Sequence, residues 1–391
     1  MCIGRFLPLF MFASVQVLAQ SSGVSFRIHE PQISARAAGM GNAFTAVAND
    51  YSAIFYNPAA LARREDGELN LFIDAGVNTS IFRFADDITK AQNTPGTDAQ
   101  KQQAVIAAIE KYYGRGFGFR VQPAAGYLVR PGWGIAFIPV ELTVEEVIHK
   151  GVGPSVDTTV YADTTLAGSY ADDFKGLSHG RLSWGVTGKF VNRGYFSKSI
   201  NFVEIATNPN LVGAADLTEG YTVDADVGLL YTPVIPDSGF ISIFRLARPS
   251  FALVARNVLD LGFNHKMGLI NKNPTDGKPE KLIRRIDIGT RWEYPSFWIF
   301  GGRGVMDFRN LLHPNWTFKK GLHIGFEFDW TMASWWRGAY RVGLSHGYLT
   351  AGVSAMLATF NLDLVTYAED GGPPTNPVEN RYVLMRLNFN I

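Results

Sequence analysis

The chain has 391 residues, and its 36 Lys and Arg against 35 Asp and Glu give a formal net charge of +1. Nucleic acid and anionic membrane surfaces attract an excess of basic residues, so this balance argues against both as partners. The 40 Gly, 28 Phe, 15 Tyr and 8 Trp, at a mean hydropathy of +0.02, are typical of an all-β chain and argue against a bundle of membrane-spanning helices, which would be far more apolar.

Residues 1–19 read as a signal peptide. Arg5 precedes an apolar stretch over residues 6–13, and Val17-Leu18-Ala19 supplies the small-x-small pattern that signal peptidase cleaves. A buried N-terminal strand or helix is the less favoured alternative. Cleavage would remove the only cysteine, Cys2, so we predict an exported, mature chain without thiol chemistry, integral to the outer membrane.

Residues 20–66 precede the first predicted strand and lack its alternation. Their central part, residues 34–62, is rich in small residues and ends in the turn-forming Asn57-Pro58-Ala59. Because small residues pack closely, we predict that this segment fills the lumen of a barrel as a hatch, or plug. The Asn-Pro-Ala turn either fixes the hatch against the wall or moves during transport, and both roles stay open.

Residues 67–391 are predicted to form a transmembrane antiparallel β-barrel of about 14 strands. In residues 321–332, five apolar residues from Leu322 to Trp330 alternate with polar or small ones, and residues 383–391 repeat this period of two. Runs of about 9 to 12 residues suit a tilted membrane strand better than a soluble sandwich, the alternative architecture. The other strand-like runs are residues 69–77, 117–129, 133–144, 184–192, 223–231, 250–257, 286–294, 297–308, 337–344 and 360–367, with weaker candidates at 158–166 and 196–205.

Two segments need separate interpretation. Residues 342–362 carry no Asp, Glu, Lys or Arg and are long enough for a spanning helix, but they are rich in Gly and have His346-Gly347 near the middle. We therefore predict two strands joined by a short turn. Residues 98–113 follow the cap-like Thr97 and predict a helix in an extracellular loop, which either packs over the barrel mouth or acts as a gate.

The Gly-rich run that leads past an Asn/Asp pair into Asn-Pro-Ala resembles the hatch of FadL-type outer-membrane transporters. The sequence of residues 35–50 and 56–61 is similar to the PorV/PorQ-like subgroup and to spirochaetal FadL-like proteins. The C-terminal strands of that subgroup are similar to residues 322–327, 341–344, 347–352 and 362–364. The resemblance implies a fourteen-stranded barrel whose extracellular loops catch a hydrophobic compound. The compound then escapes sideways through a gap in the wall after the hatch rearranges. The hatch residues that we assign to the site are Arg36, Gly39, Gly41, Phe44, Asn49, Asp50, Phe55, Tyr56, Asn57, Pro58 and Ala59.

Three functions compete. The first is passive transport of long-chain fatty acids or other hydrophobic compounds, and the second is a PorV-like docking or shuttle role in protein secretion. An enzyme is the least favoured, because no nucleophile and base can be assigned and the scattered histidines predict no metal or cofactor. The expected partners are a hydrophobic small molecule or fatty acid, outer-membrane lipid, the barrel-assembly machinery and, for the second function, secretion-system proteins. An apolar lumen with a wall gap would favour transport, and a sealed wall with aromatic loops would favour docking.

Overall fold

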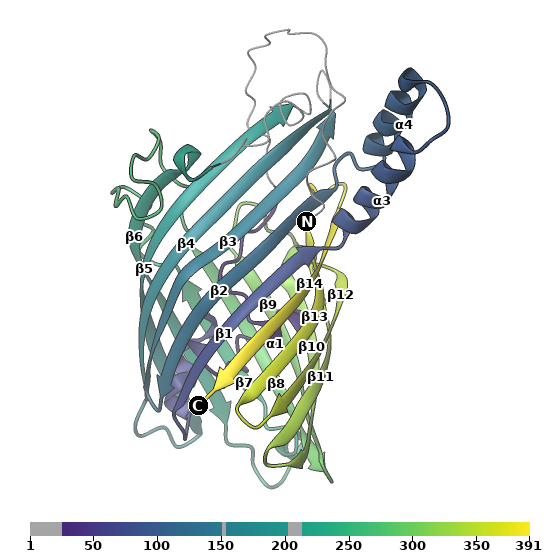
Figure 1. Ribbon diagram of the computed structural model, residues 1–391. Helices are drawn as coiled ribbons and strands as arrows, with labels where there is room; N and C mark the ends of the chain where they lie inside the picture. Colours follow the sequence, from purple (N-terminus) through teal and green to yellow (C-terminus); the bar gives the residue numbers. More distant parts are fainter. Residues whose placement is uncertain (1–25, 151–153, 202–212) are drawn as a thin grey trace.

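The computed structural model describes residues 26–150, 154–201 and 213–391, so the predicted signal peptide lies outside the described residues. Fourteen strands form a closed barrel in which each strand pairs antiparallel with the next and β1 pairs with β14 (Figure 1). This topology confirms the predicted fold. The strands are β1 (Glu68–Asn78), β2 (Gly116–Arg130), β3 (Trp133–Lys150), β4 (Pro154–Asp173), β5 (Gly180–Asn201), β6 (Thr218–Pro233), β7 (Ser250–Arg256), β8 (Arg285–Phe297), β9 (Phe300–Leu311), β10 (Leu322–Ala333), β11 (Trp336–Ser345), β12 (Tyr348–Leu357), β13 (Phe360–Asp370) and β14 (Glu379–Asn390).

The alternation found in the sequence separates an apolar outer face from a polar inner face. In β10, Phe326 and Phe328 are exposed on the outside, whereas His323 and Glu327 are buried inside. In β14, Met385 is exposed and Arg386 is buried. A barrel that closes between its first and last strands and has an apolar outer face is the architecture of proteins that span an outer membrane.

The two ends of the barrel differ in the length of their connections. At one end, the links are residues 131–132, 174–179, 234–249, 298–299, 334–335 and 358–359. At the other end, long links of residues 79–115 and 257–284 occur. Outer-membrane barrels have short periplasmic turns and longer extracellular loops, so we name these the periplasmic and extracellular ends.

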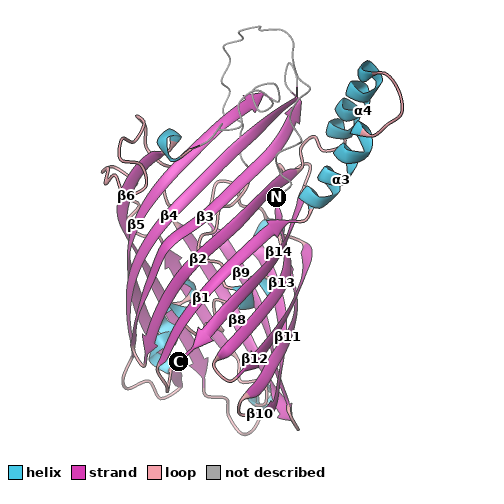
Figure 2. Cartoon of the chain, in the orientation of Figure 1, coloured by secondary structure: helices cyan, strands magenta, loops and turns pink. Residues whose placement is uncertain are grey.

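The predicted helix is confirmed as α4 (Asp98–Glu110), whose N-terminus is capped by the Thr97 side chain, but it does not pack over the barrel mouth as expected (Figure 2). It forms a hairpin with α3 (Ser80–Gln92), which was not predicted. Phe84, Ile109 and Tyr112 pack together at the foot of the hairpin, which leans away from the barrel (Figure 2). No helix within the described ranges is long and apolar enough to cross a membrane.

Two strand predictions have different outcomes. Residues 342–362 do form two strands, β11 and β12, and the turn residues His346 and Gly347 have φ values of 53° and 78°. The separate strand predicted over residues 196–205 is wrong, because β5 continues through Gly194, which pairs with Ala162 of β4 without reversing the chain. Residues 202–205 lie outside the described residues.

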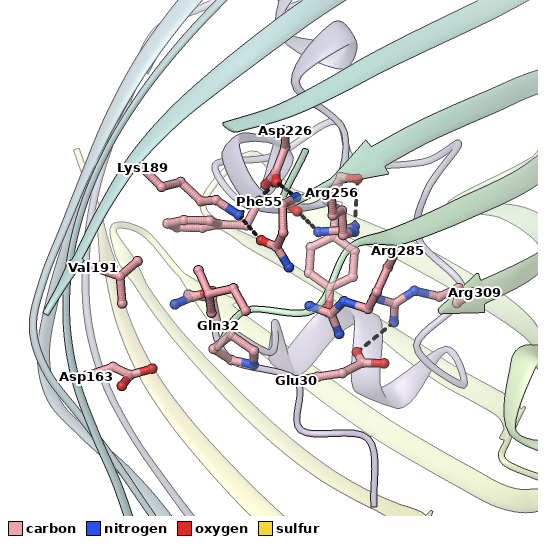
Figure 3. Close-up of a pocket in the computed structure, with 14 residues that line it drawn as sticks. Glu30, Gln32, Phe55, Asp163, Lys189, Val191, Asp226, Arg256, Arg285 and Arg309 are labelled. Atoms are coloured by element: carbon pink, nitrogen blue, oxygen red, sulfur yellow. Dashed lines mark hydrogen bonds and ion pairs between the residues drawn. The ribbon is translucent and has the colours of Figure 1, made fainter. Parts of the chain in front are cut away.

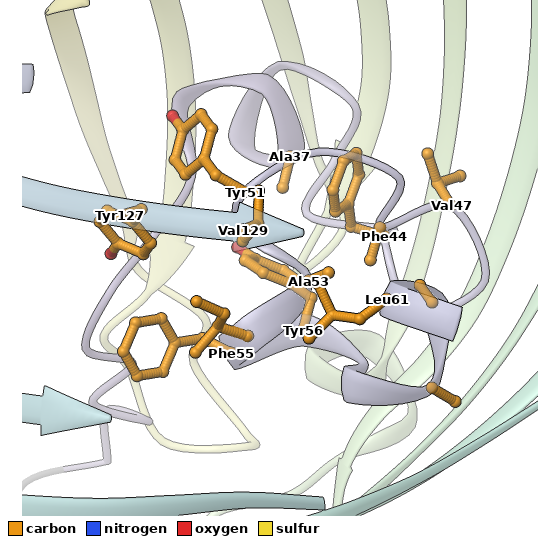
Figure 4. Packing of buried hydrophobic residues seen from close by; sticks show 14 of the residues in the cluster. Ala37, Phe44, Val47, Tyr51, Ala53, Phe55, Tyr56, Leu61, Tyr127 and Val129 are labelled. Carbon is orange, nitrogen blue, oxygen red and sulfur yellow. The ribbon is translucent and has the colours of Figure 1, made fainter. Parts of the chain in front are cut away.

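Residues 26–66, the N-terminal segment, run through the barrel interior from the extracellular to the periplasmic end. Lys320 Nζ donates to the Phe26 carbonyl at 2.7 Å near the extracellular end, and Arg63 Nη2 donates to the Arg181 carbonyl at 2.8 Å near the periplasmic end. The largest hydrophobic cluster lies between this segment and the inner wall (Figure 4). The short helices within the described residues are α1 (Ala35–Gly39), α2 (Ala53–Tyr56) and η1 (Pro58–Arg63) in this segment, and η2 (Ala214–Asp216), η3 (Phe240–Arg245) and α6 (Phe318–Gly321) between strands.

Candidate functional site

The predicted hatch residues are held in two contacts with the barrel wall, on different strands. The first, which we call the charged contact, surrounds Arg36. Arg36 Nε and Nη2 donate to the two carboxylate oxygens of Glu327 at 2.8 and 2.7 Å, and its Nη1 donates to Asp50 at 2.9 Å and Asn49 at 2.8 Å. Arg341 Nε also donates to Glu327, at 2.7 Å. One buried carboxylate therefore joins the segment to β10 and β11.

Arg36 keeps its charge in this contact. Burial lowers the pKa of its guanidinium, but Glu327 and Asp50 outweigh burial and raise that pKa well above its usual value. Arg36, Asn49 and Asp50 were assigned to the site from the sequence. The sequence did not assign Glu327, because an inward-facing carboxylate identifies its partner only when the strand register is known.

Glycines let the backbone of the segment approach the wall at the same contact. Gly41 has a φ of 66° and its N–H donates to Thr350 Oγ1 at 3.0 Å, while Thr350 Oγ1 donates to the Gly39 carbonyl at 3.1 Å. A Cβ atom on Gly325 or Gly343 of the wall would overlap the backbone of residues 40–41. Side chains at these wall positions would displace the segment.

The second contact, which we call the Asn-Pro contact, fixes the turn at Asn57. The buried Asn57 side chain accepts the Ala59 N–H at 3.1 Å and so caps η1, with Pro58 at the first helical position. Its Nδ2 donates to the carbonyls of Thr45 at 2.9 Å and Leu229 at 3.3 Å. One side chain thus ties the turn to the rest of the segment and to β6.

Glycines shape this contact as well. A Cβ atom on Gly185 of β5 would lie 2.5 Å from the Ala59 nitrogen, and one on Gly228 of β6 would overlap the Asn57 side chain. Thr187 Oγ1 adds a hydrogen bond of 2.7 Å to the Ile54 carbonyl. The wall therefore has a recess that fits the Asn-Pro-Ala backbone.

The remaining assigned residues, Phe44, Phe55 and Tyr56, form the interior of the segment. The rings of Phe44 and Tyr56 meet edge to face with centroids 5.3 Å apart, and Tyr56 Oη donates to Asn42 at 2.6 Å. Phe55 and Tyr56 also line a cavity of about 30 Å³, which has room for little more than water (Figure 3). Their contacts are those of packing residues, and a role of the assigned residues in transport stays a prediction.

Ion pairs line the lumen, as the charged residues on the polar faces of the predicted strands, such as Asp287 and Arg386, indicate, but the sequence did not identify the partners. Glu30 of the segment pairs with Arg309 of β9 at 3.1 Å, next to Arg285 (Figure 3). Burial raises the pKa of Glu30, but Arg309 and Arg285 outweigh burial and hold that pKa well below its usual value. Further buried pairs include Arg193 with Asp163, Lys189 with Asp226, Arg256 with Asp287 and Arg386 with Asp74.

Two larger cavities lie on opposite sides of the N-terminal segment. The outer cavity, toward the extracellular end, has a volume of about 200 Å³ and is lined by residues that include His29, Tyr161 and Arg285. The inner cavity, toward the periplasmic end, has a volume of about 590 Å³ and borders the charged contact at Arg36 and Glu327. The segment thus stands between two chambers.

The ladder of paired strands that forms the barrel wall is interrupted at β7. This strand has 7 residues between the 16 of β6 and the 13 of β8, and its ladder with β6 covers only Val227 to Tyr231 of β6. Residues 257–284, which we call the wall loop, continue the wall toward the extracellular end. Tyr221 N–H donates to the His265 carbonyl at 2.8 Å, and the outer cavity lies directly behind the loop.

Carboxylates of β6 secure the wall loop, and Glu219 accepts the largest number of its backbone hydrogen bonds. Glu219 accepts the backbone N–H groups of Leu269, Ile270 and Asn271 at 2.7, 3.1 and 2.7 Å. Asn192 also donates to Glu219, at 2.9 Å. Asp224 accepts the Leu259 N–H at 3.0 Å, and Val258 N–H donates to the Ala225 carbonyl at 2.9 Å. The loop is therefore held by side-chain carboxylates and single backbone hydrogen bonds, where a strand would be held by a continuous ladder.

In the part of the chain that the structure describes, no group of three or more His, Cys, Asp or Glu side chains is arranged to hold a metal ion.

No family model and no curated protein matches the sequence. Among solved structures, the chain is similar to a FadL homologue from Pseudomonas aeruginosa, with a TM-score of 0.40 and 10% identity over 94% of this chain and 98% of that one. It is also similar to the CymD monoaromatic hydrocarbon channel (TM-score 0.45, 8% identity, 90% and 96% covered) and to the Ralstonia pickettii toluene transporter TbuX (TM-score 0.41, 9% identity, 90% and 97% covered). The fold assignment rests on the strand pairing itself.

Proposed function

We propose that this protein is a plugged outer-membrane channel that passes hydrophobic small molecules, such as long-chain fatty acids, passively from the cell surface into the membrane. The observation that carries the proposal is the wall loop. It replaces the strand ladder between β6 and β8 where the outer cavity lies, so the cavity and the bilayer are separated there by a loop. In this proposal residues 1–19 are cleaved, residues 20–66 act as the hatch, and the assembly machinery inserts residues 67–391.

The charged lumen supports a sideways exit over an axial one. An apolar solute that continued toward the periplasm would pass the ion pairs around Glu30 and Glu327 and would separate charges from their partners. A solute that leaves through the wall gains about 25 cal/mol per Å² of surface removed from water. Leu259, Leu261 and Leu269 of the wall loop are exposed among polar side chains, and in this proposal the route reaches lipid beside them without an energy source.

A reversible disulfide across the wall loop tests this route. The only cysteine of the chain is Cys2, so Tyr221→Cys combined with His265→Cys creates a single pair at the bridge between β6 and the loop. With the disulfide formed, uptake of labelled oleate by a transporter-deficient host should fall severalfold, and a reductant should restore it.

The matched control is Thr159→Cys with Ser197→Cys, which joins β4 to β5 at a paired position in the continuous ladder. This disulfide should leave uptake unchanged. Equal uptake by the oxidised and reduced Tyr221–His265 variant would contradict the proposed exit.

A second candidate function, docking of exported proteins for a secretion system, is favoured by the hairpin of α3 and α4. Phe82 and Ile106 are exposed on this hairpin, outside the barrel wall. If docking is the function, deletion of residues 80–110 should block release of exported proteins while oleate uptake stays normal. Normal release after the deletion would argue against docking through the hairpin.

A further inference from the structure

The connection between β6 and β7, residues 234–249, is unusual for the periplasmic end. Four of the six connections at this end have two residues, and the fifth spans residues 174–179. Reversing two neighbouring antiparallel strands needs only a short turn. The extra length of this connection, which we call the periplasmic turn, includes the helix η3 and calls for another explanation.

The periplasmic turn exposes large apolar side chains. The exposed fractions are 69% for Val234, 87% for Phe240, 68% for Ile243 and 72% for Leu246. Contiguous apolar surface of this kind is avoided in water and marks contact with a protein or a membrane.

The turn folds back against the lipid-facing side of the wall. The Phe244 ring lies on Trp292 of β8 with centroids 5.7 Å apart, and Trp292 in turn lies 6.4 Å from Phe251 of β7. Phe251 and Leu253 point outward and are exposed, as lipid-facing residues are. The apolar surface of the turn is therefore continuous with the band that the barrel presents to lipid.

Basic residues accompany the apolar ones. Arg245 and Arg248 are exposed within the same turn, and Arg245 pairs with the exposed Asp237. Trp298 is exposed in the adjacent turn between β8 and β9. Arginine together with aromatic and aliphatic side chains is the composition of segments that lie at the headgroup level, where guanidinium groups reach phosphates.

We propose that the periplasmic turn is a membrane anchor that binds phospholipid in the inner leaflet of the outer membrane. Phe240, Ile243 and Leu246 enter the acyl region, and Arg245 and Arg248 contact phosphate groups. The anchor fixes the depth of the barrel next to β7, its shortest strand. The inference is independent of the transported compound.

Site-specific quenching tests the anchor. Phe240→Cys and Ile243→Cys, each replaced singly in the otherwise cysteine-free mature chain, are labelled with the polarity-sensitive fluorophore NBD and reconstituted into phosphatidylcholine vesicles. Doxyl-labelled phosphatidylcholine should quench both labels, and aqueous iodide should not.

The matched control is Lys175→Cys, which is exposed in the turn between β4 and β5 at the same end. Iodide should quench this label severalfold more strongly than doxyl lipid does. Iodide quenching at residues 240 and 243 equal to that at residue 175, without quenching by doxyl lipid, would overturn the anchor and leave the surface to a protein partner.

Discussion

The two contacts that hold the N-terminal segment differ in chemistry. The charged contact joins Arg36 to the carboxylate of Glu327, which Arg341 also contacts. Glycines of the wall let the backbone of the segment come close at this contact. The Asn-Pro contact uses the neutral amide of Asn57 and a recess at Gly185 and Gly228. Both contacts require glycine at specific positions of the wall, but only the charged contact depends on ion pairs.

The surroundings of the contacts differ as well. The charged contact borders the inner cavity of about 590 Å³, so its side chains have space to rearrange. At the Asn-Pro contact the backbone is packed directly against the wall. We expect the charged contact to release first when the segment moves, and the Asn-Pro contact to act as the fixed end.

The largest effect is expected for Glu327→Ala. The substitution leaves Arg36 and Arg341 buried without their shared carboxylate, which should lower the free energy of unfolding by about 3–5 kcal/mol. It should also raise the conductance of the barrel in a planar bilayer. The control Asp329→Ala removes a carboxylate whose side chain is 40% exposed and should change both quantities far less. Equal effects would show that the charged contact does not hold the segment.

A smaller loss is expected for Gly185→Ala at the Asn-Pro contact. The added methyl group meets the backbone of Pro58 and Ala59, and such overpacking costs about 1–3 kcal/mol. Urea unfolding followed by tryptophan fluorescence measures the loss. Gly188→Ala, on the same strand but in open space, should be close to neutral. A neutral Gly185→Ala would mean that the fixed end can shift.

Asn57→Ala should have an effect of similar size. It removes the cap of η1, which is worth about 0.5–2 kcal/mol, together with two hydrogen bonds to carbonyls. Asn57→Ser, whose hydroxyl can still accept the Ala59 N–H, should recover the part due to the cap. If the two variants were equally destabilised, the cap would contribute nothing to the contact.

Mild acid should have the smallest effect. The pKa of Glu30 is depressed below its ordinary value of 4.5 in the folded protein, so its stabilising contribution is complete above that pH. The contribution is lost only as the pH falls through the lower, folded-state pKa. The midpoint of thermal unfolding should therefore show no Glu30-dependent change between about pH 7 and pH 4.5, which Glu30→Gln checks by comparison. A Glu30-dependent change centred above pH 4.5 would mean that the pKa of Glu30 is raised, not lowered, in the folded protein.

The predictable parts of the fold were those that lipid and local chain chemistry determine. Strands such as β10 could be predicted because every second side chain must be apolar to face lipid. Helix α4 has a capping box at Thr97, whereas Thr79 before α3 makes no side-chain cap, and α3 was missed. The turn at Asn57 could be predicted because proline restricts its neighbour.

The partners of the predicted site residues could not be found from the sequence. Arg36 and Glu327 are 291 positions apart, and only the order and register of the strands bring them together. The same holds for Gly185 and Gly228, which look like ordinary small residues until the segment is placed against them. The sequence indicated which residues belong to the predicted hatch but not which positions of the wall they contact.

The joining of the first and last strands has a consequence for biogenesis. Arg386 of β14 donates to Asp74 of β1 at 3.0 Å, to the Ile33 carbonyl at 2.8 Å and to Tyr51 Oη at 2.9 Å. The seam that closes the barrel is thus built partly from the N-terminal segment. We therefore expect closure of the seam and placement of the segment to depend on each other during assembly, because Arg386 joins β14 to both.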